Sequence, residues 1–179
     1  HGHRVVTVGR ALVNRLAAHD GRRTFGVVLK HVLALPATGN QTFSLSQARG
    51  ASLVLYFYPK DNTPGCTTEA GEFRDLHAQF LRAGCAVYGI SRDSMKSHEG
   101  FKARLKLPFE LLSDAEEAAC TLFGVIRQKV LYGKPVRGIE RSTFVIDGDG
   151  VLRREWRGVK APGHAAEILE FVKSLQGKK

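Results

Sequence analysis

Cysteine is scarce in this chain, and its copies lack the spacing of any common cysteine framework. Cys66, Cys85 and Cys120 lie far apart and form no C-x-x-C pair. Secreted disulfide scaffolds, structural zinc sites and thioredoxin-type reductases all need closely spaced cysteines or a Cys/His cluster. The sequence argues against these classes. We expect a reducing compartment, in which each cysteine is either a small buried hydrophobe or a reactive thiol.

Long hydrophobic runs are also missing. The longest apolar run has about seven residues, whereas a transmembrane helix needs ~20. The first residues contain no secretory hydrophobic segment. We therefore expect a soluble, cytoplasmic protein with no membrane partner.

Acidic residues are outnumbered, with 17 Asp and Glu against 27 Lys and Arg and a net charge of +10. About half of this excess lies in residues 1–30, where Asp20 is the only acid. Basic segments can bind nucleic acid, but these cations are not interleaved with aromatic residues that would stack on bases. We expect no nucleic-acid partner.

Residues 1–25 are Arg-rich, lack an initiator Met and show only weak helical spacing, at Ala11, Leu12, Leu16 and Ala17. Three interpretations stay open: residues left from expression or upstream translation, a native disordered basic arm, or an organelle transit peptide. We predict that residues 1–25 are a basic N-terminal extension. Residues 26–179 contain enough apolar side chains for one core and are predicted to form a single domain.

Three histidines of the predicted helices, His77, His98 and His164, are scattered without metal-ligand spacing. We interpret them as solvated surface residues and expect neither a metal site nor a cofactor.

The apolar pattern predicts strands at the start and centre of the domain. "FGVVLKHVLAL" and "QTFSLSQ" indicate short strands around a turn at "PATGN". "ASLVLYFY" and "CAVYGIS" are continuous apolar runs of strand length, which is typical of central strands covered on both faces. "RSTFVI", "DGDG" and "VLRREW" indicate a later hairpin.

Helical spacing predicts a helix over residues 67–83 and another near the C-terminus, at 165–175. Ser94 can cap a further helix, and Asp114 with Glu117 resembles a capping box for a helix in "EEAACTLFG". Strand–helix–strand units followed by a hairpin and a helix predict the α/β class. We expect a thioredoxin-like fold with a central mixed β-sheet flanked by helices.

Cys66 stands in "PKDNTPGCTTE", between a buried strand and the predicted helix 67–83. Unpaired N–H groups and the macrodipole at a helix N-terminus favour a negative charge, so the thiolate is favoured over the thiol. Thr63 offers a hydroxyl that can accept and donate a hydrogen bond, and Pro59 and Pro64 restrict the loop. A Pro/Gly-rich turn with an incidental cysteine is the alternative.

The string "FYPKDNTPGCTTE" closely resembles the active-site loop of the peroxiredoxins, whose signature places Pro, Thr and Cys as Pro59, Thr63 and Cys66 stand here. "GISRDS", "FELLSD", "FGV" and "GIERSTFVID" are similar to the bacterioferritin comigratory protein, or PrxQ, branch. The resemblance covers about residues 30–175 and rests on a highly specific motif.

The resemblance implies that Cys66 is the peroxidatic cysteine of a thiol peroxidase in antioxidant defence, which attacks hydroperoxides and becomes a sulfenic acid. The family's active-site arginine falls on Arg141, which otherwise would be a surface residue at a strand end. Glu69 matches the acidic position that orients this arginine; an acid that merely complements the helix dipole is its alternative. The family needs no cofactor.

The chain departs from the family where many members carry a second, resolving cysteine. Gly71 stands five residues after Cys66, and Lys102 stands at the position that a second subgroup uses. On a helical wheel Cys120 lies off the apolar face and is expected to be partly exposed, while Cys85 is expected to be a core residue.

We therefore expect a one-Cys cycle with thioredoxin, glutathione or glutaredoxin as the reductant, in a monomer or weak dimer. Cys120 or Cys85 as the resolving residue stays open. Two alternatives to the peroxiredoxin remain: a glutathione-peroxidase-like enzyme, disfavoured because Trp156 in a late strand is the only tryptophan, and a basic binding or holdase module that keeps a redox fold.

Overall fold

The computed structural model describes residues 27–28, 33–48 and 50–176. The predicted extension at residues 1–25 lies outside them. The strands are β1 (Val27–Val28), β2 (Ala34–Ala37), β3 (Gln41–Ser44), β4 (Ser52–Phe57), β5 (Cys85–Ser91), β6 (Leu111–Ser113), β7 (Ile126–Leu131), β8 (Lys134–Ile139), β9 (Ser142–Ile146) and β10 (Val151–Arg157). The helices are α2 (Pro64–Arg82), α3 (Met95–Leu105), α4 (Ala118–Phe123) and α5 (His164–Gln176).

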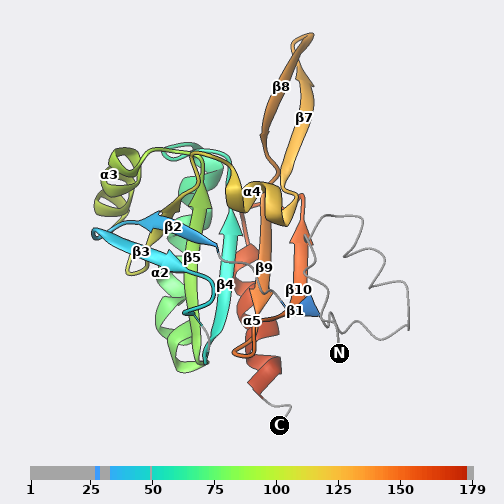
Figure 1. The fold of residues 1–179 in the computed structure, drawn as a ribbon. Coiled ribbons are helices and arrows are strands. Elements are labelled where there is room, and N and C mark those ends of the chain that lie inside the picture. The colour runs from blue at the N-terminus through green and yellow to red at the C-terminus, as the bar shows by residue number, and fades with distance from the viewer. Residues whose placement is uncertain (1–26, 29–32, 49, 177–179) are drawn as a thin grey trace.

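One mixed sheet organises the described residues, with strand order β1-β10-β9-β4-β5-β6-β2-β3 (Figure 1). β4, β5 and β6 run parallel, and β9 pairs with β4 in the antiparallel direction. The predicted hairpin of residues 141–156 is β9–β10. The predicted thioredoxin-like α/β fold with a mixed sheet and flanking helices is confirmed.

Two clusters of buried side chains cover the two faces of the sheet. Because side chains alternate along a strand, Leu53, Leu55 and Phe57 of β4 enter one cluster, and Val54 and Tyr56 enter the other. The first cluster lies under α4 and the β2–β3 hairpin. The second lies under α2 and α5, which Figure 1 shows behind the sheet. Strand β4 is thus buried on both faces, as its continuous apolar run predicts.

Helix boundaries were predicted well at caps with a strong local signal. Helix α2 begins three residues earlier than predicted, because Pro64 occupies its first turn. Ser94 caps α3 as predicted, and its hydroxyl accepts a hydrogen bond from the Ser97 N–H at 3.2 Å.

The capping-box prediction at Asp114 and Glu117 is wrong in detail. Glu117 adopts a left-handed conformation (φ 62°) and precedes a helix of only six residues. Both oxygens of Asp114 accept hydrogen bonds further along, from the N–H groups of Ala119 and Cys120. The helix therefore starts at Ala118, later than the pattern indicates.

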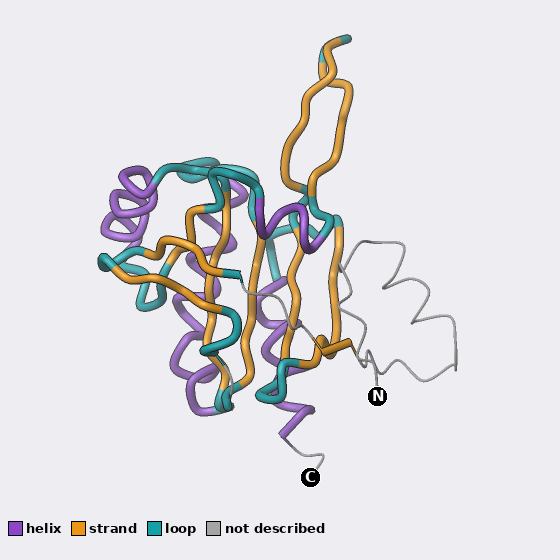
Figure 2. The backbone as a smooth tube through the Cα atoms, viewed as in Figure 1, coloured by secondary structure: helices purple, strands orange, loops and turns teal. Residues whose placement is uncertain are grey.

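The sequence interpretation missed the hairpin β7–β8. It forms a separate two-stranded sheet that projects from the domain, as the paired orange strands in Figure 2 show. Its two-residue turn, Tyr132-Gly133, has positive φ at both positions (53° and 76°), which is the conformation of a tight type I′ turn.

Candidate active site

Cys66 lies in the first turn of α2, directly beyond the central strand β4. Thr63 is the N-cap residue of this helix, and Pro64 opens it. Cys66 is only 2% exposed. The predicted strand–loop–helix placement of the thiol is confirmed, so its sulfur lies where helix N–H groups favour negative charge.

The guanidinium of Arg141 contacts Cys66, although the two residues are 75 positions apart. Its Nη2 donates to the Cys66 Sγ at 3.4 Å, and its Nη1 donates to Glu69 Oε1 at 2.6 Å. Gly65 gives the guanidinium room, because a Cβ at this position would lie 3.0 Å from Nη2. The structure thus brings three of the predicted site residues together, and Arg141 is not a surface residue.

Glu69 is completely buried in the second turn of α2. An acid that only complements the helix dipole belongs in the first turn and in solvent, so this alternative does not describe Glu69. Burial raises the pKa of Glu69 to about 7, with Arg141 partly opposing the rise and Glu72 adding to it. The Glu69 carboxyl is therefore less readily ionised than an exposed glutamate, and Arg141 is the group that favours its charged form.

The pKa of Arg141 is raised. Burial works against its charge, but Glu69 and the Cys66 sulfur stabilise that charge more strongly. The cation is thus permanent and stays available to a negative sulfur or to a polar ligand beside it.

Thr63 and Pro59 shape the loop that leads to the sulfur. The Thr63 hydroxyl donates to the Lys60 carbonyl at 2.7 Å. Its proton is therefore engaged within the loop, and its oxygen can still accept a hydrogen bond. Pro59 is exposed at the bend after β4.

Asp61 anchors the same loop to α3, which the sequence interpretation missed. Its side chain is 1% exposed, and Oδ1 accepts from the Tyr58 hydroxyl at 2.7 Å. Oδ2 accepts from the Ser97 hydroxyl at 2.8 Å and pairs with His98 Nδ1 at 2.7 Å. His98 Nε2 contacts the Leu112 carbonyl at 2.9 Å. We call Tyr58, Asp61, Ser97 and His98 the loop clamp.

Two residues of the loop clamp, together with Asp93, form a cluster of possible metal ligands. Asp61, Asp93 and His98 have ligand atoms within 4.8 Å of one another. However, Asp93 Oδ2 accepts from the Asp61 N–H at 2.9 Å and from the Ser91 hydroxyl at 2.6 Å. Burial opposes ionisation of Asp61, but its hydrogen bonds outweigh burial and lower its pKa. Hydrogen bonds thus account for the geometry of this cluster.

The prediction that His77, His98 and His164 are solvated is wrong. They are 9%, 0% and 2% exposed, respectively. His98 belongs to the loop clamp, and His164 Nε2 lies 2.7 Å from the Thr143 hydroxyl in β9. Burial lowers the pKa of His164 to about 4, and nearby Arg141 lowers it further while Glu167 opposes the shift. These partners are distant in sequence, so residue spacing alone gave no sign of burial.

Comparison with known proteins agrees with this geometry. Residues 31–155 match the model of the AhpC/TSA family. Peroxiredoxin Bcp of Bacillus subtilis is 47% identical over 146 residues, which cover 82% of this chain and 93% of that protein. The chain belongs to the peroxiredoxins of the AhpC/TSA family.

Solved structures place it in the Bcp/PrxQ branch. The bacterioferritin comigratory protein of Xanthomonas campestris aligns with a TM-score of 0.77 and 46% identity, over 80% of this chain and 91% of that chain. A mutant PrxQ of Xylella fastidiosa gives a TM-score of 0.81 and 44% identity, over 85% and 96% of the two chains. The protein is therefore a thiol peroxidase of Bcp/PrxQ type that acts through a peroxidatic cysteine.

The other two cysteines of this peroxiredoxin are buried and unpaired. Cys85 is a core residue as predicted, and burial raises its pKa to about 12. Cys120 is 0% exposed, so its predicted partial exposure is wrong. The wheel assumed a longer helix, whereas α4 has only six residues, and four of the five from Ala119 to Phe123 are buried, Thr121 being the exception. Burial, together with Asp114, raises the pKa of Cys120.

Neither buried cysteine lies near Cys66. Cys85 follows the end of α2 and Cys66 is near its start, so a rise of about 1.5 Å per residue separates them by roughly 25 Å. Cys120 packs in the cluster on the opposite face of the sheet. A disulfide needs Cα atoms about 4.4–6.8 Å apart, so either bridge would require the domain to rearrange.

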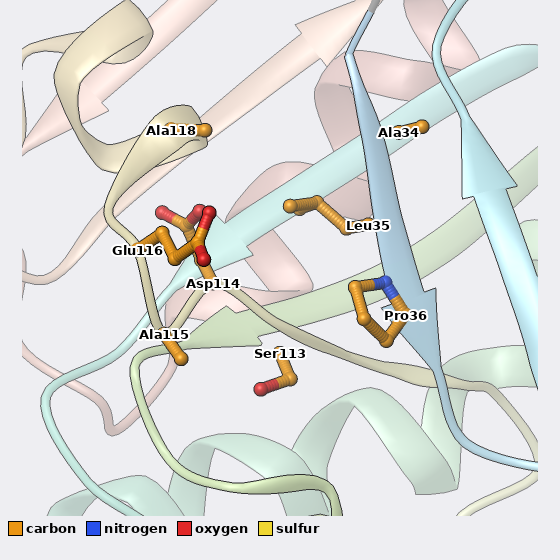
Figure 3. A pocket seen from close by; sticks show the side chains of 8 residues that line it. All are labelled: Ala34, Leu35, Pro36, Ser113, Asp114, Ala115, Glu116 and Ala118. Atoms are coloured by element: carbon orange, nitrogen blue, oxygen red, sulfur yellow. The ribbon is translucent and has the colours of Figure 1, made fainter.

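A cavity of about 300 Å³ lies between β2 and the connection from β6 to α4 (Figure 3). Asp114 and Glu116 line it together with Leu35 and Pro36. Its lining includes none of the predicted site residues, and both oxygens of Asp114 are already bonded to backbone N–H groups of α4. The reactive thiol is thus elsewhere.

Proposed function

We propose that Cys66 is the peroxidatic cysteine and that Arg141, Thr63, Pro59 and Glu69 complete its site. The observation that carries this proposal is the hydrogen bond from Arg141 Nη2 to the Cys66 sulfur. A fixed cation beside the sulfur stabilises the thiolate and can hydrogen-bond a peroxide oxygen. The peroxiredoxin domain in this proposal spans residues 26–179.

The chemical step is a displacement at oxygen. The Cys66 thiolate attacks the terminal oxygen of the hydroperoxide, an S–O bond forms and the O–O bond breaks. The sulfur is oxidised to a sulfenic acid, and the leaving oxygen takes a proton to become water or an alcohol. Arg141 stabilises the negative charge that moves from sulfur to the leaving oxygen.

Each neighbour has a distinct role in this proposal. Thr63 accepts a hydrogen bond from the peroxide while its own hydroxyl donates to the Lys60 carbonyl. Pro59 restricts the start of the loop. Glu69 orients Arg141, and its raised pKa keeps the guanidinium from being fully neutralised.

Alkyl hydroperoxides are proposed substrates together with hydrogen peroxide. The similar Xanthomonas campestris protein has alkyl peroxide reduction activity. Cys66 of this chain packs in the same apolar cluster as Tyr56 and Phe73, whose rings stack at 4.5 Å.

The cycle is proposed to need only one cysteine of this chain. The separations of Cys85 and Cys120 from Cys66 support this, as does Lys102, which forms an ion pair with Glu110 at 2.7 Å where a subgroup carries its resolving thiol. A first external thiol, from thioredoxin, glutathione or glutaredoxin, condenses with the sulfenic acid and releases water. A second thiol then releases Cys66 and leaves as a disulfide. We propose a cytoplasmic monomer or weak dimer.

Mass spectrometry after one equivalent of peroxide tests the site and the cycle together. We expect a sulfenic acid trapped on Cys66 alone, loss of peroxide consumption in Cys66→Ser, and retained turnover in Cys85→Ser and Cys120→Ser with an external thiol. A Cys66–Cys120 disulfide contradicts the one-Cys cycle without affecting the peroxidatic role. Peroxide consumption by Cys66→Ser contradicts the role of Cys66.

A further inference from the structure

The hairpin β7–β8 holds most of the exposed hydrophobic surface among the described residues. The described residues include five large hydrophobic side chains that are exposed. Four of them belong to this hairpin: Val130 at 74%, Leu131 at 50%, Tyr132 at 102% and Val136 at 42%. A two-stranded hairpin gains little stability by itself in water. A cluster of apolar side chains this exposed marks an interaction surface.

The charged residues of the hairpin differ between its base, next to the domain, and its tip, at the turn. Residues 126–139 contain four cations and no acidic residue. The two arginines at the base pair with the domain, Arg137 with Glu117 and Arg127 with Glu140. Lys129 and Lys134 flank the apolar turn. The tip therefore combines exposed apolar side chains with two lysines, which the pairing of the strands places on the same face as Leu131.

The apolar side chains surround the tip instead of forming one face. Leu131 is paired with Lys134, and Val130 is paired with Pro135. Because neighbouring residues of a strand point to opposite faces, Val130 and Leu131 lie on opposite sides of the hairpin. Tyr132 projects at the turn.

We propose that this hairpin inserts its tip into the surface of an anionic lipid bilayer. A protein partner would cover one face of the hairpin, and a second copy of the chain would bring equal positive charges together. A fluid interface can surround both faces of the tip at once. Aromatic and aliphatic side chains enter the headgroup–acyl boundary by about 5–10 Å, and the long side chains of the lysines beside them extend to anionic headgroups.

The dimensions fit this arrangement. Strand residues rise about 3.3 Å each, so the four steps from Gln128 to Tyr132 carry the tip roughly 13 Å outward, farther than the tip needs to insert. Figure 1 shows the hairpin rising from the end of the sheet where β4 ends, and Arg141 follows β8 by two residues. If Cys66 acts as proposed above, docking turns its end of the domain toward a surface where acyl hydroperoxides form.

This inference revises the expectation of no membrane partner, which considered only spanning segments. Among the described residues, none of the helices combines the length and the hydrophobicity needed to cross a bilayer. Insertion of a hairpin tip is a peripheral contact and needs no such helix.

Co-sedimentation of the full chain with vesicles tests the proposal. We expect binding to phosphatidylcholine vesicles that contain phosphatidylserine and much weaker binding to phosphatidylcholine alone. The double variant Lys129→Gln/Lys134→Gln should bind about thirtyfold more weakly, since each cation near an anionic surface contributes ~1 kcal/mol. Lys96→Gln/Lys160→Gln removes the same charge from exposed positions elsewhere and should change binding far less.

The apolar part is tested separately with Leu131→Ser/Tyr132→Ser against Leu81→Ser, a leucine that is 57% exposed on α2. Only the hairpin variant should lose vesicle binding, and both should consume soluble peroxide at the wild-type rate. Equal binding by wild type and both hairpin variants overturns the proposal and assigns binding to another basic segment. Equally strong, lysine-dependent capture by polyglutamate also overturns it, because an acidic protein would then suffice.

Discussion

The active-site loop and the hairpin β7–β8 leave the same end of the sheet, but a key side chain of the loop is buried whereas those of the hairpin tip are exposed. In the loop, Asp61 is buried and hydrogen-bonded on both oxygens. In the hairpin, Tyr132 and its neighbours are exposed and contact solvent. The loop is held in one geometry before a substrate arrives, which favours fast chemistry. The hairpin keeps its apolar surface available, which favours association.

We expect the largest effect when one partner of the buried Asp61–His98 pair is removed from the loop clamp. His98→Leu leaves the Asp61 carboxylate buried without its ring partner. We expect a loss of about 3–5 kcal/mol in the free energy of unfolding, because an uncompensated buried charge is costly. Urea denaturation measures this loss.

A matched double variant separates charge from packing. Asp61→Asn/His98→Leu leaves no unpaired charge and should recover part of the stability while peroxide reduction stays slow, since the loop is no longer anchored to α3. A His98→Leu protein with wild-type stability and turnover would show that the loop clamp contributes nothing.

A smaller change tests the packing of Arg141 against the loop. Gly65→Ala puts a Cβ 3.0 Å from Arg141 Nη2, so the guanidinium must shift by a few tenths of an ångström. A displacement of about 1 Å can cost up to 10²-fold in rate, so this smaller shift should slow peroxide reduction severalfold and by less than 10²-fold. Gly71→Ala, later in the same helix and 3.6 Å from the mobile end of Arg74, is the control. Equal rates in both variants would contradict a positioned arginine.

How far the sequence predicts these two regions depends on whether the signal is local. Cys66 was placed at a helix start because a buried strand, two prolines and an apolar helical pattern surround it. Arg141 is joined to it only through the family resemblance, since no periodicity relates positions 75 residues apart. Glu69 is three residues from Cys66, but only the resemblance links it to Arg141. The partner of Asp61 is also remote, at 37 positions, and without a motif to mark it the sequence predicts His98 as a surface residue.

Local sequence patterns also gave a wrong helix boundary where one residue adopts a left-handed backbone conformation. Glu117 takes a left-handed conformation, so α4 starts later than the apolar pattern indicates and Cys120 turns into the core. The hairpin carried a usable signal, because Tyr132-Gly133 separates two short apolar and basic runs. Glycine at the second turn position is typical of a type I′ hairpin, but the mixed charge of the flanking runs hid the strands.

The pH dependence of stability tests a second buried side chain near the active site, His164. His164 has a pKa of about 4 in the folded domain, below its ordinary value near 6.5. Its contribution to stability is therefore complete above pH ~6.5 and is lost as the pH falls toward 4, by about 3 kcal/mol. His164→Gln keeps a donor near Thr143 without this titration. Unfolding midpoints between pH 7 and 4 should fall less steeply in the variant; parallel curves would contradict the assignment.

The smallest effect on folding is expected at the hairpin tip. Val130→Ser/Tyr132→Ser removes two exposed side chains that pack against nothing in the described domain, and exposed substitutions usually change stability by no more than about 0.5 kcal/mol. We expect an unchanged urea midpoint and unchanged consumption of soluble peroxide. Leu55→Ala, in the buried strand β4, is the opposite control and should cost about 2–5 kcal/mol. A loss of similar size at the tip would mean that the hairpin packs against the protein in solution, and the contrast between a fixed loop and an available hairpin would fail.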